Sequence, residues 1–139
     1  MVVHVDAELD KWSVDDVTQC EDRIVNQSRA VLPPGSEVEI QQGLDDFNKI
    51  LRPLGLQTRL VVVERANSLA LYLICLTLTA LMSLRDQWRR RQLRDIVERL
   101  FTFLSGAGRE VGVERLSWPL SDYERCLEYF RSVQGEALI

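Results

Sequence analysis

The chain has 139 residues, of which 46% are hydrophobic and 27% are charged, and its formal net charge is −4 at pH 7. This length suits one domain built around a single core, and the composition excludes an intrinsically disordered chain. The acidic balance argues against a protein that binds nucleic acid chiefly through its phosphates. We therefore treat residues 1–139 as one folded domain.

The first part of the chain predicts a strand and two helices. Residues 2–5 read VVHV, a β-branched run typical of a short strand. Apolar residues then recur at helical spacing, which predicts a helix over residues 13–29 with Ser13 as its N-cap. The sequence LPPG at 32–35 ends this helix. A second helix is expected over residues 36–51 on the apolar stripe formed by Ile40, Leu44, Phe47 and Leu51.

Two adjacent segments predict an antiparallel hairpin. Residues 57–65 (QTRLVVVER) and 69–78 (LALYLICLTL) are rich in β-branched and apolar side chains, and a short turn joins them. One face of this hairpin is expected to carry Leu60, Val62, Leu69, Leu71, Leu73 and Cys75. The other face is expected to carry Val61, Val63, Tyr72, Ile74, Leu76 and Leu78.

Because both faces of the hairpin are apolar, the second face needs a cover. An antiparallel sheet with one face in water alternates apolar and polar side chains, and this hairpin does not. Two interpretations stay open. In the first, an additional helix, over residues 13–29 or 121–134, covers the second face within the chain. In the second, part of that face binds another protein or a second copy.

The last part of the chain predicts a long helix, a strand and a final helix. Apolar residues in one broad helical stripe predict a single helix over residues 79–104. Residues 110–118 (EVGVERLSW) are typical of a strand. Ser121 and Glu124 match a capping box, which predicts that the final helix starts at Ser121.

The order of these elements predicts the fold class. It is strand, helix, helix, strand, strand, helix, strand, helix. With one helix and the tail left out, this is the split β-α-β-β-α-β arrangement of ferredoxin-like sheets. We expect an α+β plait in which a four-stranded antiparallel sheet is packed with about four helices.

A membrane-anchored protein is the alternative to this fold. Nineteen uncharged residues, 66–84, lie between Arg65 and Arg85, which is close to the length of a helical membrane span. The basic segment that follows would suit a cytoplasmic flank. The hairpin is favoured for two reasons. The stretch contains several polar residues, and a membrane span would leave the preceding strand without its partner.

The sequence predicts no enzyme and no cofactor. His4 is the single histidine, so no histidine-based catalytic constellation is evident. The carboxylate pairs Asp15–Asp16 and Asp45–Asp46 are of the kind that bind divalent metals, yet they lie where acids suit a helix terminus, and we expect no metal site.

Features that the sequence lacks predict the cellular compartment and argue against a nucleic-acid partner. The cysteines are odd in number, without a CxxC pair, and no signal peptide is evident, so we expect a cytoplasmic protein. Stacking aromatics on the central strands are limited to Tyr72, so we expect no nucleic-acid partner.

Three stretches carry a resemblance to a known family. They are VVHVDAELDK at 2–11, RLVVVERANSLALYL at 59–73 and VGVERLSWPLSDYERCLEYF at 111–130. The chain resembles the N-terminal α/β-plait domain of the TRADD family of death-receptor adaptors. The resemblance implies a non-enzymatic signalling adaptor, with a role in cell death, that docks another protein through its sheet edge and nearby loops.

Charge and side-chain type predict the binding residues. Residues 59–104 carry eight basic and four acidic residues, and the segments on either side are both net acidic. Aromatic and arginine side chains dominate binding energy at protein interfaces. We therefore predict that Tyr72 and Ile74 on the second face bind a partner protein or a second copy, with Arg89, Arg90 and Arg91 as an electrostatic rim.

Overall fold

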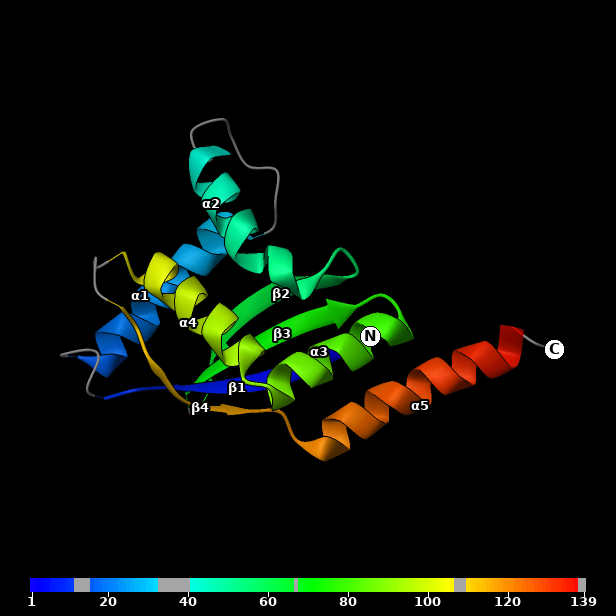
Figure 1. The fold of residues 1–139 in the computed structure, drawn as a ribbon. Helices are drawn as coiled ribbons and strands as arrows, with labels where there is room; N and C mark the ends of the chain where they lie inside the picture. The colour runs from blue at the N-terminus through cyan, green and yellow to red at the C-terminus, as the bar shows by residue number, and fades with distance from the viewer. Residues whose placement is uncertain (12–15, 33–40, 67, 107–109, 138–139) are drawn as a thin grey trace.

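The computed structural model describes residues 1–11, 16–32, 41–66, 68–106 and 110–137, with side chains for all of these except 41–45 and 134–137. The strands are β1 (Val2–Leu9), β2 (Thr58–Arg65), β3 (Leu69–Cys75) and β4 (Val113–Ser117). They form one sheet in the order β2-β3-β1-β4, and every neighbouring pair is antiparallel (Figure 1).

This strand order confirms the predicted α+β plait. The central strands are β1 and β3, and the connections β1 to β2 and β3 to β4 each skip one strand and carry helices, as in the split β-α-β-β-α-β arrangement. The β2–β3 hairpin forms as expected. Strand β3 ends at Cys75 instead of residue 78, because the Thr77 side chain accepts a hydrogen bond from the Ala80 N–H and caps the next helix.

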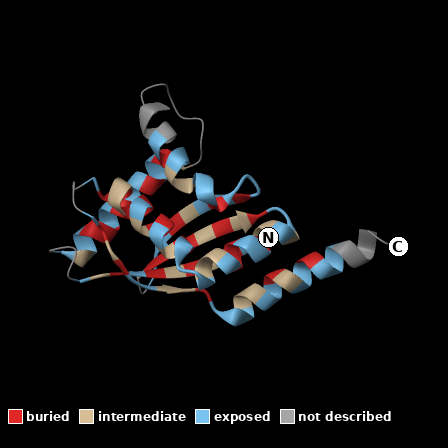
Figure 2. Cartoon of the chain, in the orientation of Figure 1, coloured by how far each residue is buried: buried red, intermediate tan, exposed pale blue. Residues whose placement is uncertain are grey.

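Most of the helices form a layer over one face of the sheet, and the last one lies along the sheet's edge (Figure 1). They are α1 (Val17–Val31), α2 (Gln41–Leu51), the 3-10 turn η2 (Arg52–Leu54), α3 (Leu78–Arg89), α4 (Gln92–Ser105) and α5 (Leu120–Ala137). Helix α1 packs against α4 and β2, and α2 packs against α4. Figure 2 shows that the buried residues lie mainly between this layer and the sheet.

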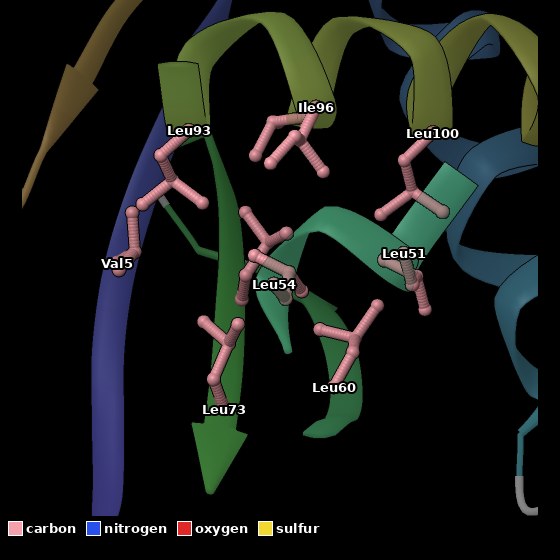
Figure 3. Close-up of a pocket in the computed structure, with 10 residues that line it drawn as sticks. Val5, Leu51, Leu54, Leu60, Leu73, Leu93, Ile96 and Leu100 are labelled. Carbon is pink, nitrogen blue, oxygen red and sulfur yellow. The ribbon is translucent and has the colours of Figure 1, made fainter. Parts of the chain in front are cut away.

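The core beneath α4 is closely filled by apolar side chains. Figure 3 shows side chains from α4, from the sheet and from the α2–η2 segment converging on a residual cavity of about 10 Å³. A space of this size holds about one water, and an apolar lining gives such a water no partner. The labelled residues are Val5, Leu51, Leu54, Leu60, Leu73, Leu93, Ile96 and Leu100.

Helix α1 starts later than the sequence predicts. Its N-cap is Asp16, whose side chain accepts a hydrogen bond from the Gln19 N–H at 3.2 Å. The predicted cap, Ser13, lies outside the described residues. A carboxylate at an N-cap satisfies one free N–H of the first turn, so Asp16 has a structural role.

The helix predicted over residues 79–104 is in fact two helices. Arg91 has a φ of 64°, in the left-handed region, and it separates α3 from α4. The Arg90 N–H binds the carbonyl of Asp86, and the Arg91 N–H binds that of Trp88. The apolar stripe is broad enough to run through this turn, which explains why the pattern did not reveal the break.

The apolar stretch 66–84 does not form one helix. It contains strand β3, a turn and the first half of α3. Among the residues that the structure describes, no helix combines the length and the apolar character needed to cross a membrane.

A buried arginine joins α3 to the start of α5. Arg85 is 7% exposed, and its guanidinium lies 4.2 Å from the ring centre of Trp88 and about 5 Å from those of Trp118 and Tyr123. It donates a hydrogen bond to the Trp118 carbonyl at 2.7 Å. Burial lowers the pKa of Arg85, and the nearby Arg89 lowers it further. Three aromatic faces partly compensate for this desolvation through cation–π attraction.

Helix α5 closes the edge of β1 beyond the end of β4. Strand β4 pairs with Asp6–Leu9 only. Nearer the N-terminus, the Asp122 carboxylate accepts a hydrogen bond from the His4 N–H at 3.2 Å, and Arg125 donates one to the Val2 carbonyl at 2.9 Å. Side chains of α5 thus replace a strand there. The helix starts at Leu120, so Ser121 lies inside its first turn. The prediction that Ser121 is the N-cap is therefore wrong.

Truncating a core side chain beneath α4 should destabilise the domain. We expect Leu100→Ala, at a site 1% exposed, to lower the free energy of unfolding by about 2–5 kcal/mol. The matched change Leu56→Ala, at a site 90% exposed, should change it by less than about 0.5 kcal/mol. Chemical denaturation followed by circular dichroism measures both. Equal effects would contradict the observed burial.

Removing the Asp122 carboxylate should loosen α5. This group accepts hydrogen bonds from the His4 N–H and from the Trp118 indole N–H, at 3.2 and 2.9 Å. Asp122→Ala leaves both donors without that acceptor, so we expect a loss of about 2–3 kcal/mol in the free energy of unfolding. Denaturation monitored by tryptophan fluorescence tests this. The exposed neighbour Glu124→Ala is the control, and an equal loss there would contradict a specific role for Asp122.

Candidate functional site

The side of the sheet that faces away from the helices is the candidate site, and we call it the open face. Strand register arranges its side chains in rows across β2, β3 and β1. The first row is Arg59, Ile74 and Val2. The second row is Val62, Tyr72 and His4. The third row is Glu64, Ala70 and Asp6, continued by Ser117 of β4, and Glu8 and Arg115 lie beyond it.

A β-bulge decides which side chains of β2 reach the open face. The pairing with β3 shifts between Leu60 and Val62, so that Val61 is an extra residue. As a result, Leu60 and Val63 both point into the core and are 7% and 0% exposed. Strict alternation predicted the opposite faces for Val62 and Val63, and that prediction is wrong for both.

No described helix lies over the open face, so the interpretation that a helix covers it within the chain is wrong. Helix α1 lies on the core side, where it packs against α4, and α5 lies along the edge of β1. Val2 remains 44% exposed, and Val62, Tyr72 and Ile74 are partly exposed. Apolar side chains of three adjacent strands are therefore accessible on one surface.

A stacked pair of rings lies at the centre of this surface. The rings of Tyr72 and His4, on neighbouring strands, have centres 4.7 Å apart and planes inclined by 26°. His4 Nε2 also lies 3.0 Å from a carboxylate oxygen of Asp6. These two contacts restrict both rings, so the surface is partly ordered before anything binds, which lowers the entropy cost of association.

The other end of the open face is polar and hollowed. A depression of about 340 Å³ lies between β1, β4 and the β2–β3 turn. It is lined by His4, Asp6, Glu8, Ala66, Ser68, Arg115 and Ser117. The face therefore changes along its strands, from mainly apolar side chains at the first and second rows, with Arg59 in the first, to mainly acidic ones at the third row and beyond.

The structure brings together only part of the predicted site. Tyr72 and Ile74 are adjacent on the open face, as expected. Arg89, Arg90 and Arg91 are exposed at the end of α3 and in the turn before α4, in the helix layer on the other side of the sheet. They cannot border Tyr72, so the predicted arginine rim is wrong. The arginine that does lie beside the apolar rows on this face is Arg59.

The predicted carboxylate pairs do not form a described site. The Asp16 side chain caps α1, and Asp46 is exposed. The side chains of Asp15 and Asp45 lie outside the described residues. Within the described part of the chain, no three side chains of histidine, cysteine, aspartate or glutamate are grouped so that they could hold a metal ion.

The cysteines are buried thiols. Cys20, Cys75 and Cys126 are free and at most 6% exposed. Burial raises the pKa of all three, and that of Cys126 to about 11, with the Asp122 carboxylate contributing. Because the thiolate is the nucleophile, these thiols are unsuited to redox or nucleophilic chemistry in the folded state.

Comparison of the chain with protein-family models, with curated proteins and with solved structures yields no match.

The thiols should be unreactive until the domain unfolds. We expect the native protein to react with an aromatic disulfide reagent at mildly alkaline pH far more slowly than a short cysteine peptide, because little thiolate is present and access is blocked. In denaturant all three should react at the peptide rate. Absorbance of the released thiolate measures this, and a fast native phase of one equivalent would contradict the burial of one cysteine.

Proposed function

We propose that this chain is a non-enzymatic protein-interaction domain of the adaptor type, and that its binding surface is the open face. One observation carries this proposal: apolar side chains of three neighbouring strands lie accessible on a sheet face that no described helix covers. A large contiguous apolar patch on a protein surface usually marks an interaction site.

The composition of the open face supports binding to protein. Tyr72 combines a large apolar surface with a hydroxyl group and few rotatable bonds, which is the kind of side chain that contributes most at interfaces. Val62 and Ile74 flank it, and polar residues surround this apolar centre. An apolar centre with a polar border is the usual arrangement of a protein interface.

A cytoplasmic signalling role is part of the proposal. Three free, buried cysteines support a reducing compartment, where thiols persist without pairing. The resemblance to the N-terminal domain of the TRADD family supports an adaptor in a signalling or cell-death pathway. Binding is assigned to the sheet alone, because Arg89, Arg90 and Arg91 lie in the helix layer.

Site-specific photo-crosslinking in native cells tests the proposed surface. A benzophenone amino acid at position 62, in the second row, should give covalent protein adducts, whereas the same probe at Met82 of α3, 54% exposed, should not. When Tyr72→Arg is added to the probe variant, the adducts at position 62 should disappear, because the substitution places a charge in the contact. The circular dichroism spectrum should stay that of the native protein, because Tyr72 is outside the core.

Two results would contradict this function. Adducts at position 62 that persist unchanged in the Tyr72→Arg variant would show that contact there does not depend on the proposed surface. Equal adducts at positions 62 and 82 would show that the probe captures neighbours without preference for the open face.

A further inference from the structure

The charges on the open face are arranged with opposite signs at its two ends. Arg59 lies in the first row, and Glu64 lies in the third row on the same strand. The first and third rows are about 14 Å apart along a strand, if the extra residue of the bulge is not counted. Asp6 and Glu8 of β1 add negative charge at the Glu64 end, where Arg115 of β4, beside Glu8, is the basic residue. Between the two ends lies the second row, with Tyr72 at its centre.

This arrangement is complementary to itself. If a second sheet is turned over about a twofold axis that runs across the strands at the second row, its first row lies over the third row of the first copy. Strand β2 then lies over β2, so that Arg59 of each copy faces Glu64 of the other. A twofold interface requires such a self-complementary patch, because each pair of contacts occurs twice.

We propose that a second copy of this chain occupies the open face, packed sheet to sheet about this twofold axis. The inference rests on the proposed function, since it names the occupant of the same surface. Sheets that pack face to face keep their strands within about 30° of each other, which the natural twist of both sheets permits.

The second row supports the same pairing. Tyr72 and Val62 meet their own counterparts at the axis. The apolar second row then supplies the affinity, and the two Arg59–Glu64 pairs fix the register, since exposed ion pairs add specificity more than binding energy.

Charge reversal tests the pairing directly. Sedimentation velocity from low micromolar to millimolar protein should show the wild type moving reversibly from monomer to dimer. Arg59→Glu places two carboxylates opposite each other, and Glu64→Arg places two guanidinium groups together, so each variant should dimerise at least about tenfold more weakly. The double variant Arg59→Glu/Glu64→Arg restores opposite charges and should dimerise as the wild type does. An equimolar mixture of the two single variants should form the mixed dimer.

Controls separate this interface from general charge effects. Arg89→Glu and Glu124→Arg make the same charge changes on the helices and should leave dimerisation unchanged. Tyr72→Arg should be monomeric with a native circular dichroism spectrum. Thermal melts of each variant show whether the fold is retained.

Two outcomes would overturn the proposal. A wild type that stays monomeric over the whole range would exclude a second copy, and the adducts at position 62 would then decide the proposed function on their own. A dimer that survives Tyr72→Arg, or that weakens in the single variants without recovery in the double variant or in the mixture, would place the contact elsewhere or in another register.

Discussion

The bulge at Val61 is the constraint on which the open face depends. Without it, strict alternation along β2 would place Val63 on the same side as Val61 and would remove Val62 from the row of Tyr72. The extra residue allows Leu60 and Val63, on either side of the bulge, to fill the core while Arg59, Val62 and Glu64 face outward. Because β2 is an edge strand, the bulge also disrupts the flat edge that a foreign strand could extend.

The second edge of the sheet is protected by a different device. Beyond the end of β4, α5 supplies a carboxylate and a guanidinium where a strand would supply a carbonyl and an N–H. The start of α5 is in turn held by Arg85, whose charge is surrounded by Trp88, Trp118 and Tyr123. A buried charge costs stability unless it is compensated, and here the three rings and the Trp118 carbonyl supply part of that compensation.

Much of the fold could be predicted from the sequence, because periodicity reports which residues are buried together. The hairpin followed from two β-branched, apolar runs joined by a short turn, and the plait followed from the order of the elements. The break at Arg91 could not, since a left-handed arginine has no sequence signature and the apolar stripe continues across it. The site was predicted in part. Tyr72 and Ile74 share a strand and so share a face, whereas the side of the sheet on which Arg89 lies depends on how α3 packs.

His4 and Glu64 were missed for a related reason. Neither has a sequence pattern that points to a binding surface; strand register alone places His4 beside Tyr72 and Glu64 two rows from Arg59. Register also explains why both faces of the hairpin looked apolar when only one is core. A face that is mainly apolar in its first two rows, with Arg59 at one end, and mainly acidic beyond them remains compatible with an unbound domain in water, because its charged groups stay hydrated.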